Sequence, residues 1–82
     1  MTDNNLLRRI TVRPDVFGGK PIVRDMRISV ESILRLLAQN ESWDAILDDY
    51  PDLEPEDLRA CLEYARAVIA NESLEDVQVA GR

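Results

Sequence analysis

One stretch, residues 18–30 with the sequence GGKPIVRDMRISV, constrains the fold more than any other. It holds two of the three glycines, the only lysine and two short β-branched runs. Upstream, residues 10–12 form another β-prone run, which is stopped by Pro14 and Asp15. Downstream, the apolar segments have the spacing of helices. The stretch therefore marks the change from extended to helical structure.

Within this stretch, residues 22–24 and 27–29 predict the two arms of a tight hairpin whose tip is Asp25-Met26. Asp25 tolerates the positive φ that such turns require, whereas Met26 gains nothing there. Because a two-stranded ribbon is marginal by itself, we expect it to pair with residues 10–12 or with a second copy of the protein.

Three helices are expected between residues 30 and 70, where apolar side chains recur at three- and four-residue spacing. Ser29 and Ser42 are good N-caps for the first two, and Pro51 ends the second. Pro55 suits the first turn of the third helix, although its N-cap is then Glu54, a poorer choice than serine or threonine. The apolar stripe of this third helix is expected to face inward and comprises Leu58, Cys61, Leu62, Ala65, Val68 and Ile69.

These elements predict a mainly α fold, a three-helix bundle of the helix-turn-helix kind with a short N-terminal β-hairpin. The 82 residues form one small domain with a marginal core, which favours a dimer or a bound partner. We divide the chain into a flexible N-terminus (1–9), a single domain (10–70) and an acidic C-terminal tail (71–82). Within the domain, a β-segment (10–29) precedes the helices (about 30–70).

The charge differs between the two halves of the chain. Residues 1–40 carry seven basic and four acidic side chains, a net charge of +3, whereas residues 41–82 carry three basic and twelve acidic ones, a net charge of −9. The total of −6 argues against a general nucleic-acid binder. Two faces with different partners would explain the division, and so would an acidic helix surface that is simply solvated.

The composition argues against an enzyme. The chain has no histidine, the usual general base and a common zinc ligand, and its one cysteine, Cys61, lies on the apolar stripe. The run Gly18-Gly19-Lys20 lacks the spacing and the hydroxyl of a phosphate-binding loop. We therefore expect no catalytic residue, no metal and no cofactor. No apolar run reaches the roughly 18 residues of a membrane span and no signal-peptide pattern is present, so we expect a soluble cytoplasmic protein.

Basic residues of the β-segment are the candidates for binding DNA, namely Arg13, Lys20, Arg24 and Arg27. If Arg24 and Arg27 flank a hairpin tip, a dimer would present a basic ribbon to phosphates or to a groove. By contrast, Glu54, Glu56 and Asp57 at the start of the third helix would repel phosphate there. The alternative is that these arginines bind no partner and only keep the surface of the hairpin hydrated.

Residues 9–65 resemble the bacterial family catalogued as domain of unknown function number 433. The matching motifs in this chain are GGKPIVRDMRISV, ILDDYPDL and PEDLRA. The family's usual Gly-Thr at the hairpin tip is Asp25-Met26 here, and its threonine cap before the last helix is Glu54. The resemblance implies a homeodomain-like three-helix fold. Many such proteins are thought to be VapB-type antitoxins encoded beside a toxin with a PIN-like ribonuclease fold.

The resemblance thus implies an antitoxin that neutralises a PIN-like toxin and, as a homodimer, binds its own operator DNA. The candidate toxin contacts are Arg66, Leu74, Val77 and Val79. A stand-alone helix-turn-helix transcriptional regulator without a toxin is the first alternative, and a purely structural adaptor is the second.

Overall fold

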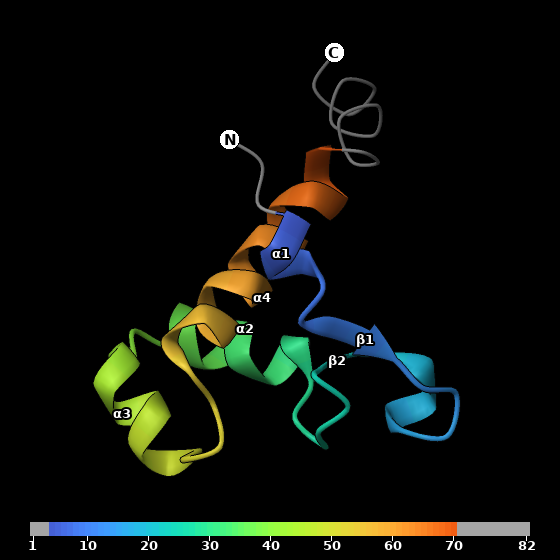
Figure 1. Ribbon diagram of the computed structural model, residues 1–82. Coiled ribbons are helices and arrows are strands. Elements are labelled where there is room, and N and C mark those ends of the chain that lie inside the picture. Colours follow the sequence, from blue (N-terminus) through green and yellow to red (C-terminus); the bar gives the residue numbers. More distant parts are fainter. Residues whose placement is uncertain (1–3, 71–82) are drawn as a thin grey trace.

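The computed structural model describes residues 4–70. In chain order these form α1 (Asn4–Leu7), β1 (Ile10–Val12), the 3₁₀ turn η1 (Phe17–Gly19), β2 (Pro21–Val23), α2 (Val30–Ala38), α3 (Trp43–Asp49) and α4 (Pro55–Val68). Figure 1 shows the long α4 over α2, with α3 on one side and the β1–β2 pair on the other. The fold is mainly helical with a short antiparallel strand pair, as predicted.

The two strands pair within one chain. Ile10 lies opposite Val23, and Thr11 lies opposite Ile22, in antiparallel register. Of the two partners expected for the predicted hairpin, residues 10–12 or a second copy, residues 10–12 of the same chain pair with its first arm. The second predicted arm, residues 27–29, is not a strand and is represented only by an isolated bridge between Ile22 and Ser29.

The tight turn lies one residue earlier than predicted. Arg24 and Asp25 both have positive φ, 44° and 62°, and the Met26 N–H donates to the Val23 carbonyl at 2.7 Å. Two successive positive φ values are typical of a type I′ turn. Asp25 tolerates this conformation, but an arginine does so only when something else holds it. In this fold the Arg24 side chain is held by Asp57 at the start of α4.

The predicted helix starts are confirmed by their caps. Ser29 Oγ accepts a hydrogen bond from the Ser32 N–H at 3.0 Å, and Ser42 Oγ accepts one from the Ala45 N–H at 3.1 Å. Asn40 has a φ of 68°, the left-handed conformation that commonly follows a helix end. These local signals are strong enough to place α2 and α3 without knowledge of the tertiary structure.

One apolar cluster joins β2 to the three longer helices. Its buried members are Val23, Val30, Ile33, Ile46, Leu53, Leu58 and Cys61. Full burial of an aliphatic side chain of this size contributes about 1.5–3 kcal/mol. Cys61 has no exposed surface, and burial raises the pKa of its thiol to about 12. A thiol in this environment behaves as a small apolar side chain and is a poor nucleophile.

The N-terminal segment contains a short helix that the sequence does not predict. Leu6 and Leu7 are partly buried because α1 packs against α4, and the Arg9 N–H closes the turn by donating to the Leu6 carbonyl at 3.0 Å. The expectation of a flexible segment over residues 1–9 thus does not describe residues 4–7. None of the helices within residues 4–70 combines the length and the hydrophobicity of a membrane-spanning segment. The predicted acidic tail, residues 71–82, lies outside the described residues.

Candidate functional site

The start of α4 holds a fully buried carboxylate. Asp57 Oδ1 accepts hydrogen bonds from Arg24 Nε and Arg9 Nη1, both at 3.0 Å. Asp57 Oδ2 accepts from Arg24 Nη2 at 2.7 Å and from the Glu54 backbone N–H at 2.8 Å. Burial by itself would raise the pKa of Asp57, but these hydrogen bonds from Arg24, Glu54 and Arg9 outweigh it and lower the pKa. The carboxylate therefore stays ionised and fully bonded.

This group of four residues, the Asp57 cluster (Arg9, Arg24, Glu54 and Asp57), fastens the β-segment to α4. Arg9 precedes β1 and also pairs with Glu54 Oε1 at 2.8 Å. Arg24 follows β2 and also donates to the Asp52 carbonyl at 3.0 Å. Both strands are thus tied, at the same end of the pair, to the start of α4. The sequence indicates Asp57 only as one of the acidic residues that begin the third helix. Its cationic partners cannot be found from local spacing, because they lie 33 and 48 residues away.

The predicted DNA-binding residues are mostly engaged by carboxylates. Arg24 is bound to Asp57, so a DNA phosphate would have to compete with a buried, bidentate partner. Lys20 Nζ lies 3.1 Å from Glu31 Oε1, and Arg13 Nε lies 3.8 Å from an oxygen of Asp15. These pairs reduce the positive charge that the β-segment presents.

Arg27 differs from the other three candidates. Its side chain is exposed just beyond the turn, and no ion pair joins it to any residue between 4 and 70. It is therefore the predicted DNA contact that is most accessible to a phosphate.

The predicted inner stripe of α4 is buried at one end only. Leu58 and Cys61 have no exposed surface, whereas Leu62, Val68 and Ile69 are 44%, 37% and 61% exposed. The prediction that all of them face the core is wrong for these three. Val68 and Ile69 lie at the C-terminal end of α4, past the helices it packs on, whereas Leu62 is turned toward a surface hollow that it lines with Leu6 and Arg59. Figure 1 shows the last turns of α4 extending past α2 and α3.

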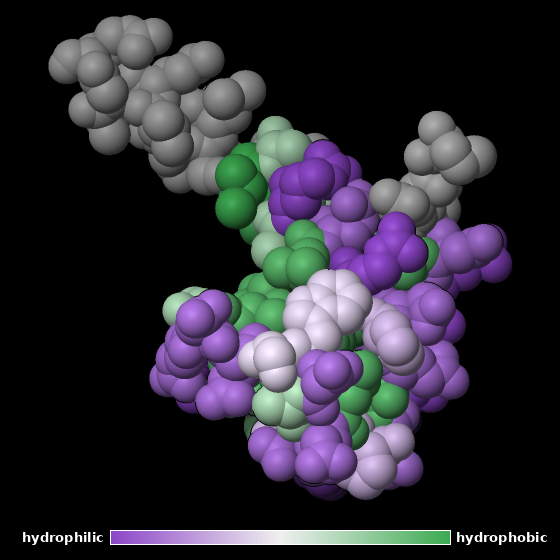
Figure 2. All heavy atoms as spheres, turned by 90° about the vertical axis from the view of Figure 1, so that its left-hand side faces the viewer, coloured by the Kyte–Doolittle hydropathy of each residue, from purple (hydrophilic) through white to green (hydrophobic). Residues whose placement is uncertain are grey.

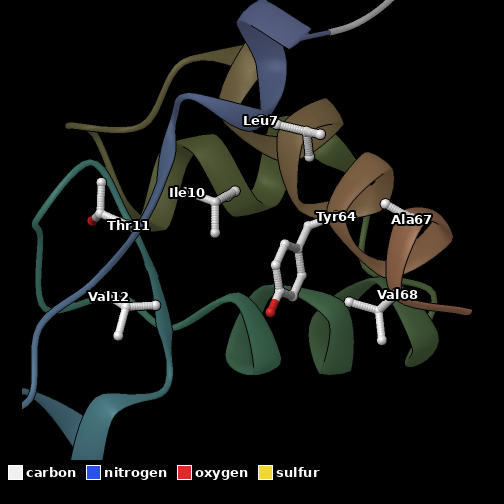
Figure 3. A pocket seen from close by; sticks show the side chains of 7 residues that line it. All are labelled: Leu7, Ile10, Thr11, Val12, Tyr64, Ala67 and Val68. Atoms are coloured by element: carbon white, nitrogen blue, oxygen red, sulfur yellow. The ribbon is translucent and has the colours of Figure 1, made fainter. Parts of the chain in front are cut away.

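Two grooves flank the exposed end of α4. The β1–α4 groove, of about 350 Å³, is lined by Leu7, Ile10, Thr11, Val12, Tyr64, Ala67 and Val68. Figure 3 shows Ile10 and Tyr64 pointing toward each other across it. Val12, at its edge, is 58% exposed. Its lining is mostly hydrophobic.

The α2–α4 groove lies on the other side of Tyr64 and Val68 and has a volume of about 380 Å³. Val30, Leu34 and Ile69 contribute apolar walls, and Lys20 and Glu31 line it as well. Tyr64 and Val68 line both grooves, so they form an apolar ridge between two apolar hollows. Figure 2 shows hydrophobic surface in patches among hydrophilic side chains on the face that it views.

The predicted toxin contact Arg66 lies on the same stretch of α4. Its Nη2 and Nε donate to the two carboxylate oxygens of Glu63 at 2.6 and 3.0 Å. Arg59 also lies within helical pairing distance of Glu63, four residues away, but the ion pair in the structure joins Glu63 to Arg66. The other candidate contacts, Leu74, Val77 and Val79, lie outside the described residues. Among residues 4–70, no group of three or more His, Cys, Asp or Glu side chains is placed to hold a metal ion.

Comparison with known proteins identifies the family. The family model described as protein of unknown function (DUF433) matches residues 10–65. Uncharacterized protein y4eO of Sinorhizobium fredii is 34% identical over 58 residues, which are 71% of this chain and 26% of that protein, so the chain spans about a quarter of this relative. The crystal structure of a DUF433 member from Anabaena variabilis superposes with a TM-score of 0.69 at 28% identity, covering 94% of this chain and 73% of the other. The chain therefore belongs to the DUF433 family of proteins of unknown function.

Proposed function

We propose that this chain is a cytoplasmic antitoxin that binds and neutralises a PIN-like ribonuclease toxin. Membership of the DUF433 family, many of whose members are thought to be VapB-type antitoxins, supports the class. The observation that carries the proposal is the exposed apolar end of α4, where Val68 and Ile69 stand beside two apolar grooves. Exposed apolar surface of this kind, rimmed by charge, typically marks a protein-binding site.

The position of this surface suits a ribonuclease partner. Ile69 lies two residues before the segment 71–82, which contains Leu74, Val77 and Val79 among acidic residues. A protein that binds RNA needs basic side chains for phosphate contacts. The half of this chain from residue 41 onward carries a net charge of −9, with three basic and twelve acidic side chains. The apolar end of α4 supplies the area of contact, and the acidic residues supply a charge complementary to the toxin's RNA-binding surface.

Co-expression with the product of the neighbouring reading frame tests this proposal. We expect a stable complex by size-exclusion chromatography with light scattering, and rescue of growth by the chain. Ile69→Glu should weaken the complex and the rescue, because it places a charge on the apolar surface. Phe17→Glu is the matched control, since Phe17 is 47% exposed in η1, away from α4. The absence of a complex, or equal effects of the two variants, would overturn the proposal.

A second candidate, a DNA-binding regulator, is favoured by the accessible Arg27. The usual mode places the start of the last helix in the major groove, and the exposed carboxylates of Glu54, the N-cap of α4, and Glu56, in its first turn, oppose this. Binding through the β-segment is the remaining mode. Arg27→Ala should then lower affinity for the chain's own promoter DNA and flatten its dependence on salt. No promoter binding by the intact chain would dismiss this candidate.

A further inference from the structure

The strand β1 has one free edge. Among the described residues the sheet contains only β1 and β2, so one side of β1 has no partner strand. The Arg24 N–H donates to the Arg9 carbonyl at 2.7 Å, which makes Arg9 and Arg24 a hydrogen-bonded pair. Because such pairs alternate along an antiparallel ladder, Thr11 directs its backbone groups toward β2, whereas Ile10 and Val12 direct theirs outward.

These outward groups lie beside an apolar surface. No hydrogen bond within residues 4–70 engages the outward N–H and C=O groups of Ile10 and Val12. The β1–α4 groove runs next to them, and Figure 3 shows Ile10 directed into it. A free strand edge beside an apolar groove is the arrangement to which an additional strand binds.

We propose that β1 pairs with β1 of a second copy, antiparallel about a two-fold axis at Thr11, so that two strand pairs become one four-stranded sheet. The outward groups fit this register. Ile10 would face Val12 of the second copy as a hydrogen-bonded pair, and Val12 would face its Ile10, which satisfies all four outward groups on each strand. Thr11 would face Thr11 of the second copy as the non-hydrogen-bonded pair between them.

The side chains are also self-complementary in this register. Each apolar residue faces an apolar residue on the groove side, and threonine faces threonine on the other, both favourable cross-strand pairs. The next pair would bring Arg9 opposite Arg13 of the second copy. Each already has a carboxylate in its own chain, Arg9 with Glu54 and Asp57, and Arg13 with Asp15, so the repulsion between them is reduced. A strand of a different protein would form only the backbone hydrogen bonds. A second copy of β1 also has complementary side chains, and we therefore favour it as the partner strand.

Cysteine cross-linking tests the register. In a non-hydrogen-bonded pair the two Cα atoms are about 4.5 Å apart, within the range that a disulfide spans. We expect Thr11→Cys to form a covalent dimer under mild oxidation. Arg13→Cys is the control, because in this register it would lie about 13 Å from its own copy. Cys61 does not interfere, since it is buried and its thiol pKa is raised to about 12.

Light scattering of the intact chain tests the assembly itself. We expect a mass of two chains, and a mass of one chain for Val12→Glu, whose exposed site tolerates glutamate in the monomer. Phe17→Glu should remain dimeric. A chain that stays monomeric over the accessible concentration range, a dimer that survives Val12→Glu, or cross-linking of Arg13→Cys as efficient as that of Thr11→Cys would overturn the proposal. None of these measurements involves a toxin, so their failure is separate from failure of the proposed function.

Discussion

Replacing Asp57 with asparagine tests the role of the Asp57 cluster. The variant keeps the shape of the side chain but removes the charge that Arg9 and Arg24 share. Removing one partner of a buried ion pair typically costs about 3–5 kcal/mol. The two arginine side chains are 27% and 37% exposed, so water can solvate them partly after the change. We therefore expect a loss of about 2–4 kcal/mol in the free energy of unfolding.

Urea unfolding followed by circular dichroism measures this loss. A small domain has a total stability of only about 5–15 kcal/mol, so the midpoint should fall by a large fraction of its value. Glu54→Gln is the matched control, because Glu54 is 54% exposed and its pair with Arg9 should contribute about 0–1 kcal/mol. An Asp57→Asn variant that lies within about 0.5 kcal/mol of the parent would refute the view that this carboxylate fastens the β-segment to α4.

Three further predictions concern the Asp57 carboxylate, the buried Cys61 thiol and the residues after Asn71. Folding lowers the pKa of the Asp57 carboxyl group. The ionised carboxylate therefore contributes its full stabilisation at pH values above its pKa in the unfolded chain, about 3.9. This stabilisation is lost as the pH falls through the lower pKa that the group has in the folded chain. Urea midpoints measured from pH 6 to pH 3 should therefore decline more steeply for the parent than for Asp57→Asn, and parallel curves would contradict this. Cys61 should react with a thiol reagent only as fast as the chain unfolds, since it is buried, whereas immediate labelling in the folded state would show that the core is open. Truncation after Asn71 should leave the circular dichroism of residues 4–70 intact but abolish rescue of growth from the toxin, and unchanged rescue would remove residues 72–82 from the proposal.

Much of the fold could be predicted from local signals. Ser29 and Ser42 act as N-caps through hydrogen bonds to N–H groups three residues ahead, so sequence spacing alone reveals them. The sequence predicts the turn at Asp25-Met26, one residue too late, because Arg24 adopts a positive φ while its side chain is held by Asp57, 33 residues away. The sequence does not predict the short α1, because four residues are too few to show a helical periodicity. The helix packs against α4, and this contact joins segments that lie far apart in the sequence.

The candidate site was less predictable than the fold. An apolar stripe indicates which side of a helix is hydrophobic but not where its packing partners end. Val68 and Ile69 follow the stripe of Leu58 and Cys61, yet they lie past the body of the molecule and are exposed. Likewise, the sequence predicts that Arg24 is accessible to DNA, whereas in the fold its guanidinium group binds the buried carboxylate of Asp57. In both cases the deciding fact is the tertiary placement of α4.

Hydrogen exchange on the chain with and without its toxin is the most direct test of the central claim, that the exposed end of α4 is the partner surface. The account predicts new protection of backbone amides over residues 64–70 and in the segment that follows, with little change in α3. Protection confined to the β-segment or to α3, with none at the end of α4, would contradict it.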